Sequence, residues 1–160
     1  MPGTVIGKEL NFGFPGTIAR NGDEVSRTRP VAEGTDDIYF GDPVIQNDDG
    51  TIQKFGVGNT AADFCGIAIR KTKQATEYFD NQNWGSYKPQ EPCAVLQRGM
   101  ITVLCEDGTP EVGGTVYVVA ADGAFSANAA GNVALTNAKF STGKDARNVC
   151  EVTIIERQGV

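Results

Sequence analysis

Histidine is absent from the 160-residue sequence. This excludes Ser-His-Asp and Cys-His nucleophile systems and removes the commonest metal ligand. Two adjacent carboxylate pairs remain, Asp36-Asp37 and Asp48-Asp49. Paired carboxylates perform acid–base chemistry when their surroundings raise the pKa of one member. Nothing in the sequence near either pair indicates such surroundings, so we expect that the protein is not an enzyme.

Three glycine-containing phrases resemble ligand-binding loops. Residues 56–60 (GVGNT) and 141–145 (STGKD) resemble phosphate loops, and residues 47–51 (NDDGT) resemble a calcium loop. The phosphate motif G-x-x-x-x-G-K-[ST] is incomplete, because Ala138 stands at its first glycine and Asp145 replaces its hydroxyl residue. The calcium loop lacks its bidentate glutamate. We interpret all three phrases as turns, and the sequence predicts no cofactor.

The four cysteines all lie in apolar, strand-like runs, and none forms a C-x-x-C pair; they are Cys65, Cys93, Cys105 and Cys150. We interpret them as small buried hydrophobic residues of a protein that resides in a reducing compartment. Two disulfides and a zinc site are the alternatives that this pattern leaves open. The favoured interpretation predicts no metal.

Composition indicates one globular domain over residues 1–160, with 40% hydrophobic and 21% charged residues. The net charge of −6 opposes nucleic-acid binding, because binders neutralise phosphates with clustered Lys and Arg. The densest basic group is Arg70, Lys71 and Lys73, which we interpret as a solvated strand end. No apolar run approaches the ~20 residues of a membrane span. The amino end lacks the order of a secretory signal, so we expect synthesis and retention in the cytoplasm.

The elements that position these residues are predicted to be strands. Residues 89–119 contain three apolar runs separated by polar, glycine-containing breaks: CAVL, MITVLC and TVYVV. Their Val, Ile, Thr and Tyr content suits a pleated surface, and we expect the first two runs to form a hairpin across Gln97-Arg98-Gly99. Turn signals recur along the chain and helical periodicity is absent. The fold class is therefore predicted to be all-β, a small barrel or sandwich.

A degenerate repeat links residues 54–69 (KFGVGNTAADFCGIAI) and 139–154 (KFSTGKDARNVCEVTI). Aligned without gaps, the copies share Lys, Phe, Gly, Ala, Cys and Ile at matching positions. The favoured interpretation is two related β-units in one core, and chance similarity of two β-rich segments is the alternative. Alternation with period two predicts that three side chains in each copy share one face. These are Cys65, Ile67 and Ile69 in the first copy and Cys150, Val152 and Ile154 in the second.

Two segments do not fit this predicted core, an extended amino-terminal segment (1–35) and a projecting loop (71–90) that is rich in aromatic residues. Aromatic residues and Arg are enriched at protein interfaces. The candidate interface residues are Phe12, Phe14, Arg20, Arg27, Arg29, Tyr78, Phe79, Trp84 and Tyr87. The alternative is that the aromatic residues cap their own barrel.

Six phrases follow one another along the chain from Phe14 to Arg157: FPGTIAR, GDPV, FCGIAIR, PQEPCAVLQRGMITV, GGTVYV and AKFSTGKDARNVCEVTIIER. Together they resemble the structural cement (capsid decoration) proteins of tailed bacteriophages. The resemblance implies an all-β domain that forms homotrimers on the capsid exterior. It also implies that the trimers bind the major capsid protein at capsomer junctions and stabilise the virion after synthesis in the host cytoplasm. The alternative is another β-rich virion or surface binding module, such as a fibre base or a glycan-binding domain with Trp84 and Tyr87 stacked on sugars.

Overall fold

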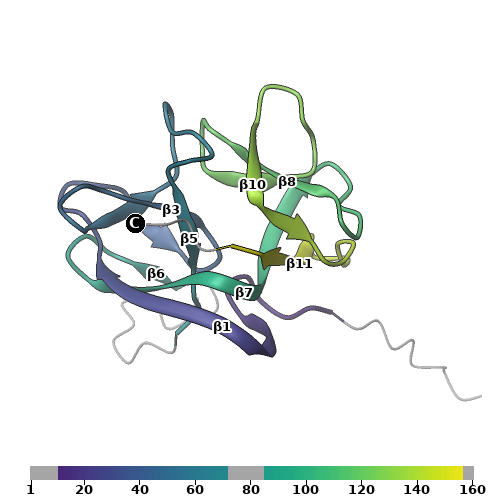
Figure 1. The fold of residues 1–160 in the computed structure, drawn as a ribbon, viewed down its shortest axis with the longest axis horizontal. Coiled ribbons are helices and arrows are strands. Elements are labelled where there is room, and N and C mark those ends of the chain that lie inside the picture. The colour runs from purple at the N-terminus through teal and green to yellow at the C-terminus, as the bar shows by residue number, and fades with distance from the viewer. Residues whose placement is uncertain (1–10, 72–84, 157–160) are drawn as a thin grey trace, which may run out of the picture.

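The computed structural model describes residues 11–71 and 85–156, and this part of the chain contains eleven strands and no helix (Figure 1). The strands are β1 (Ile18–Pro30), β2 (Ile38–Tyr39), β3 (Pro43–Gln46), β4 (Ile52–Lys54), β5 (Phe64–Ala68), β6 (Ser86–Tyr87), β7 (Pro92–Asp107), β8 (Thr115–Val119), β9 (Ala124–Ser126), β10 (Val133–Phe140) and β11 (Val149–Ile154). The predicted all-β class is confirmed, and of the two predicted architectures the structure is a small barrel with additional strands.

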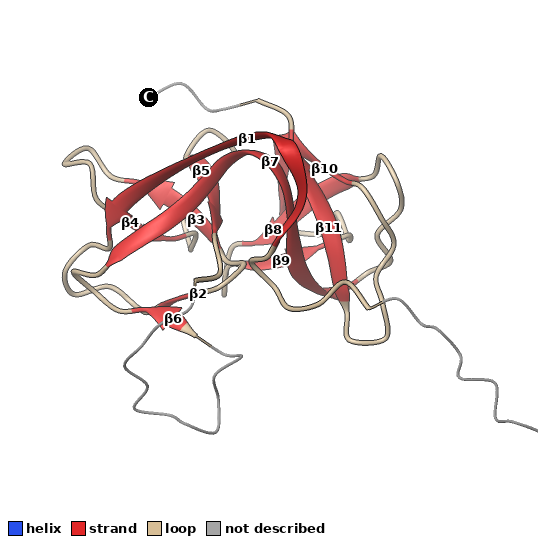
Figure 2. Ribbon diagram, turned by 90° about the horizontal axis from the view of Figure 1, so that it is seen from below, coloured by secondary structure: helices blue, strands red, loops and turns tan. Residues whose placement is uncertain are grey.

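Strand β7 runs without interruption through the point where a hairpin was predicted, so that prediction is wrong. Gly99 lies inside the strand with φ +124°, a conformation that L side chains rarely adopt. The backbone bends there but does not reverse, and β1 pairs with both halves of β7, from Pro30 opposite Pro92 to Ile18 opposite Ile101. Figure 2 shows β1 and β7 as two long curved strands side by side across the molecule.

One half of the molecule is a closed barrel. The carboxyl-terminal half of β7 pairs with β11, which pairs with β10, then β8, then β9, and β9 returns in parallel to β7. Closure removes the free edges that an open sheet would present. Its interior is filled by Val118, Phe125, Leu135, Phe140 and Val152, which belong to the larger hydrophobic cluster; that cluster also extends to residues of β3 and β5. We call this half the barrel lobe.

The other half, which we call the second lobe, is built on the amino-terminal half of β7. Here β7 pairs with β5, β5 with β3 and β3 with β4, and a bridge from Val31 to Ile52 leads back to β1. Its own smaller hydrophobic cluster includes Val31, Ile38, Val44 and Tyr87. Val31 and Tyr87 belong to the two segments that were predicted to lie outside the core, so the core extends further than the sequence indicated.

Strand β5 contains a bulge that the repeat did not reveal. Val44 of β3 pairs with Gly66, but the next residue, Ile45, pairs with Phe64, so Cys65 is the extra residue. A bulge of this kind places two consecutive side chains on the same face of the strand and reverses the alternation beyond it.

Because of the bulge, the prediction that Cys65, Ile67 and Ile69 share one face is wrong. Cys65 packs in the smaller cluster, whereas Ile67 and Ile69 pack in the larger one. In the second copy the prediction is confirmed, because Cys150, Val152 and Ile154 all pack in the larger cluster. Both strands pair with β7, but on their other side β5 lies against β3 while β11 lies against β10. A common origin of the two units stays a prediction.

The cysteines are buried and free, as predicted: Cys65, Cys93, Cys105 and Cys150. Two of them meet between β7 and β11, where the Cys105 thiol and burial together raise the pKa of Cys150. Cys150 therefore stays protonated, and the buried cysteines act as small apolar core groups.

Candidate protein-binding surface

Thr102 of β7 holds the segment before β1 against the barrel through its buried hydroxyl and its backbone. Thr102 of β7 is 2% exposed, and its Oγ1 donates to the Phe14 carbonyl at 2.7 Å and accepts from the Thr17 amide at 3.1 Å. The Gly16 amide donates to the Thr102 carbonyl at 2.7 Å. Because buried polar groups must be paired, these bonds fix the path of the backbone that carries Phe14.

The same segment also packs against the second lobe. The Arg70 amide donates to the Gly16 carbonyl at 2.7 Å, directly after β5. Gly16 has φ +84°, and a Cβ there would lie 2.8 Å from the amide nitrogen of Gly41. A side chain at position 16 would therefore push the segment away from both lobes.

Asp145 anchors the chain one step earlier. Its Oδ2 accepts from the Phe12 amide at 3.0 Å, and its Oδ1 accepts from the amides of Arg147 at 2.8 Å and Val149 at 3.0 Å. Partial burial opposes ionisation, but these amide donors prevail and hold the pKa of Asp145 below its ordinary value. The carboxylate therefore stabilises both its own turn and the amino-terminal segment at neutral pH.

These anchors present one aromatic ring between two guanidinium groups. The Arg70 guanidinium carbon lies 4.7 Å from the centroid of the Phe14 ring, and that of Arg147 lies 5.9 Å from it. Such cation–π contacts hold the three side chains in one arrangement although the Phe14 side chain is 37% exposed. We call Phe14, Arg70 and Arg147 the Phe14 cluster, and its composition is that of an interface centre.

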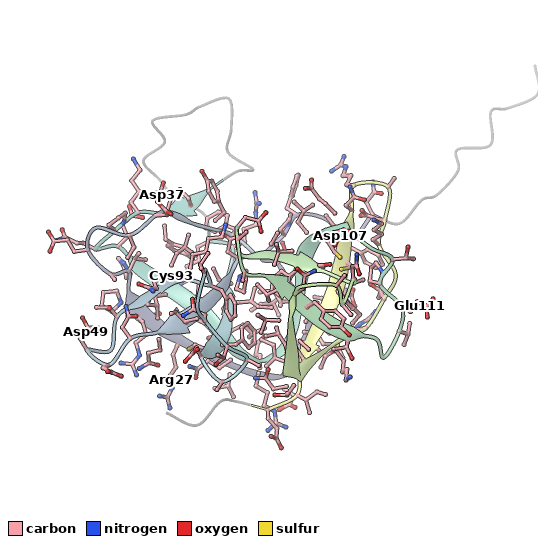
Figure 3. The ribbon with its side chains drawn as sticks, turned by 90° about the horizontal axis from the view of Figure 1, so that it is seen from above. Arg27, Asp37, Asp49, Cys93, Asp107 and Glu111 are labelled. Atoms are coloured by element: carbon pink, nitrogen blue, oxygen red, sulfur yellow. The ribbon has the colours of Figure 1, made fainter. Side chains whose placement is uncertain are left out.

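Strand β1 carries the three predicted arginines away from this cluster along the edge of the sheet. The Arg20 side chain is 67% exposed and its Nε lies 3.5 Å from Oε2 of the buried Glu151. Arg27 and Arg29 are half-buried, and Arg29 reaches the β3–β4 turn beside Gly50. Figure 3 shows Arg27 on the side of the molecule opposite Asp37.

Tyr87 lies in the core and not on the surface, which corrects its prediction as an interface residue. It is 2% exposed, its hydroxyl donates to the Ile69 carbonyl at 2.5 Å, and its ring meets the Phe40 ring edge-on at 5.3 Å between centroids. Burial raises its pKa far above the ordinary value. Tyr87 packs within its own chain, as the alternative expected of the aromatic residues, but in the smaller cluster of the second lobe and not on the barrel. Tyr78, Phe79 and Trp84 lie outside the described residues.

Of the nine predicted residues, Phe12 is held by its amide to Asp145, Phe14 lies beside Arg147, and the three arginines follow along β1. Sequence reasoning missed Arg70 and Arg147. Arg70 was visible as part of the densest basic group, but its position over an aromatic ring 56 residues away in the chain depends on the tertiary fold.

The described residues contain no group of three or more His, Cys, Asp or Glu side chains that could hold a metal ion. They also contain no helix long and apolar enough to cross a membrane.

The comparison with protein families shows which family the chain belongs to. Residues 1–155 match the model of a family described as "Structural cement protein (E217 gp24/Pam3 gp6)". The chain belongs to this family of phage structural cement proteins. Its members are structural proteins of the phage capsid, as the sequence resemblance indicated.

A solved structure supports the fold assignment. A chain from "The capsid of Myoviridae Phage XM1" is 21% identical, with a TM-score of 0.73 over 96% of this chain and 98% of that one. At this identity the likeness shows a shared fold and nothing finer. The search of curated proteins returned no match.

Proposed function

We propose that this cement protein decorates the outer surface of a bacteriophage capsid and stabilises the mature head by binding the major capsid protein. In this proposal it binds as a homotrimer at capsomer junctions. The observation that carries the proposal is the family match over residues 1–155. The closed barrel and the buried core agree with it, because a stiff body loses little conformational entropy on docking.

The trimer explains how weak individual contacts would suffice. Three linked copies present the same patch three times, and linkage raises overall avidity by ~10²–10⁴ without any new contact. A trimer seated over a junction would also join neighbouring capsomers, so that separating them requires breaking several contacts at once. This is the physical basis of the proposed stabilisation of the head.

We assign the shell-facing contacts to the outer side of β1 with Arg20, Arg27 and Arg29, together with the aromatic residues of the 71–90 segment, above all Trp84. The arginines are exposed or half-buried along a single strand, which supports a contact that follows a shell surface. The protein would act on the virion exterior after synthesis in the host cytoplasm, without a catalytic role and without nucleic acid as partner.

The test uses heads that lack the protein. Purified protein is added to such heads, unbound protein is removed by sedimentation, and bound copies are counted by quantitative gel densitometry. We expect saturable binding, and we expect Arg27→Glu/Arg29→Glu to weaken it at least 10-fold with an unchanged melting temperature. The matched control is Lys139→Glu/Lys144→Glu, which makes the same change of charge on the barrel lobe, away from β1 and from the 71–90 segment. Absence of saturable binding by the wild-type protein would refute the proposal.

A further inference from the structure

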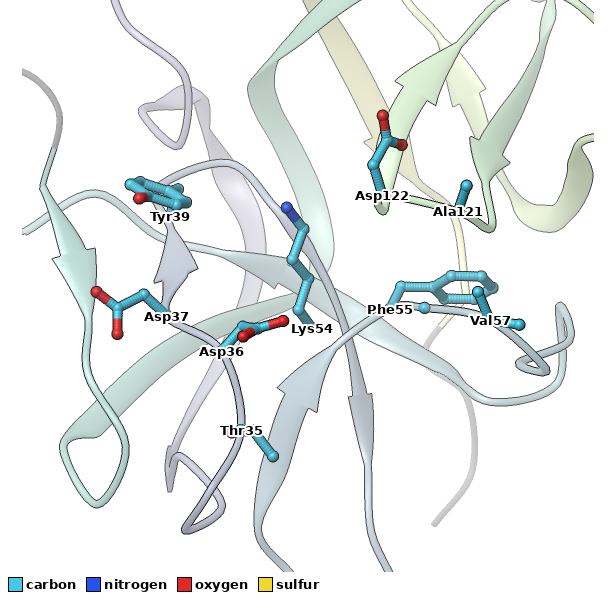
Figure 4. Close-up of a pocket in the computed structure, with 10 residues that line it drawn as sticks. Thr35, Asp36, Asp37, Tyr39, Lys54, Phe55, Val57, Ala121 and Asp122 are labelled. Carbon is cyan, nitrogen blue, oxygen red and sulfur yellow. The ribbon is translucent and has the colours of Figure 1, made fainter.

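An open cleft of about 760 Å³ separates the two lobes (Figure 4). One wall carries Asp36, Asp37 and Tyr39, which lie before and within β2, and Val57, which follows β4. The opposite wall carries Asp122, from the turn between β8 and β9. Tyr39 is 48% exposed and Val57 is 83% exposed, so the cleft presents apolar side chains beside carboxylates. We call it the acidic cleft.

The charge of the acidic cleft is negative even though a lysine lies inside it. The Lys54 ammonium is 3.2 Å from Oδ2 of Asp42, behind the cleft, and this ion pair offsets both charges. Burial raises the pKa of Asp42, and Lys54 opposes that effect. The carboxylates of Asp36, Asp37 and Asp122 are then left as an excess of three negative charges.

The Phe14 cluster has the complementary chemistry. It offers two guanidinium groups around a partly exposed ring, whereas the acidic cleft offers carboxylates around Tyr39 and Val57. Arginine pairs well with carboxylates and also stacks on aromatic faces. The chain therefore carries on its own surface both halves of a contact with a second copy.

Cyclic trimers require such a pair of surfaces. In a twofold dimer the same patch meets itself, but a threefold ring closes only through heterologous contacts between two different patches on each subunit. This requirement rests on the trimer of the proposed function. Among the described residues, the Phe14 cluster and the acidic cleft are two patches of opposite charge that each include an exposed aromatic ring.

We propose that the Phe14 cluster of one copy docks into the acidic cleft of the next copy, and that this contact closes the trimer. Arg70 and Arg147 face the carboxylates of Asp36, Asp37 and Asp122 in the neighbour, and the Phe14 ring packs beside Tyr39 and Val57. The contact leaves the arginines of β1 free for the shell.

Two charge-reversed proteins test the contact by light scattering with analytical ultracentrifugation. The cluster variant is Arg70→Glu/Arg147→Glu and the cleft variant is Asp36→Arg/Asp37→Arg. Each is expected to be monomeric at concentrations where the wild type is trimeric, with subunit affinity reduced at least about 100-fold, since close charge pairs across interfaces are strongly coupled. The matched control, Arg27→Glu/Arg29→Glu, makes the same charge change on β1 and stays trimeric.

Combining the variants separates an interface from a loss of folding. Each variant repels itself, but the cluster of either variant is complementary in charge to the cleft of the other, so an equimolar mixture associates although neither variant does so alone. A protein with all four substitutions has both charges exchanged and recovers the trimer. Trimers in either double variant, no association in the mixture, or a monomeric quadruple variant would each overturn the inference.

The outcomes also separate this inference from the proposed function. Wild-type protein that binds heads while both double variants remain trimeric refutes the contact alone. Wild-type trimers that fail to bind heads refute the proposed function and leave the contact standing.

Discussion

Replacement of Thr102 by valine tests whether a single hydroxyl holds the amino-terminal segment on the barrel. Valine has nearly the same shape as threonine, so the core around position 102 keeps its packing. The hydroxyl that donates to the Phe14 carbonyl and accepts from the Thr17 amide is removed. The expected result is a less stable protein with a loosened Phe14 cluster.

The size of the effect follows from two lost hydrogen bonds at a residue that is 2% exposed. A net contribution of about 0.5–1.5 kcal/mol for each bond gives a loss of about 2 kcal/mol, with an upper limit set by the cost of leaving the partners unpaired. For a domain of this size, that loss lowers the melting temperature by roughly 4–8 °C. Urea unfolding followed by circular dichroism measures the free energy directly.

Thr136→Val is the matched control, because Thr136 is exposed on β10 and the chemical change is the same. Its free energy of unfolding should change by no more than about 0.5 kcal/mol. If Thr102→Val costs no more than Thr136→Val, the hydroxyl does not hold the segment and the reasoning is refuted.

Three further predictions concern other positions. The pKa of Asp145 is lowered, so its stabilising contribution is complete above the ordinary Asp pKa and is lost as the pH falls through the lowered value. Asp145→Asn should therefore destabilise at pH 7 and flatten the acid limb of stability against pH, and an acid limb that is unchanged would contradict the anchor. Gly99→Ala should cost about 1–3 kcal/mol by urea unfolding, because the backbone has φ +124° and a Cβ would lie 3.2 Å from the Asp23 carbonyl oxygen. Gly22→Ala isolates the backbone contribution, because Gly22 has the same φ of +124° and open space around it. Trp84→Ala should lower occupancy on heads with an unchanged melting temperature, and full occupancy would remove Trp84 from the shell contact.

The sequence predicted what depends on local pattern. Alternating apolar runs and glycine-containing breaks correctly indicated an all-β chain, buried cysteines and the shared inward face of Cys150, Val152 and Ile154. The ordered phrases correctly indicated the family. Each of these depends on neighbouring residues or on long stretches of similar sequence.

What the sequence did not predict depends on partners distant in the chain. The sequence around Gly99 is typical of a turn, yet the long strand β1 pairs with β7 on both sides of Gly99 and keeps β7 continuous. Cys65 reads as part of a regular alternation, yet its pairing with β3 contains a bulge. Tyr87 reads as an exposed aromatic residue in a polar loop, yet Phe40 and the Ile69 carbonyl enclose it.

The Phe14 cluster also depends on residues that are distant in the chain. Phe14 was predicted from its residue type, but Arg70 and Arg147 join it only because Gly16, Thr102 and Asp145 bring three separate segments together. Long-range hydrogen bonds of this kind leave no periodic signal in the sequence.

The central claim is that this β protein strengthens the shell by binding it through several linked subunits. A density map of the decorated head tests this claim most directly. The account predicts three copies around each occupied position, outside the shell and across a boundary between capsomers, with β1 turned toward the major capsid protein. Isolated single copies, or copies on the inner surface, would contradict it.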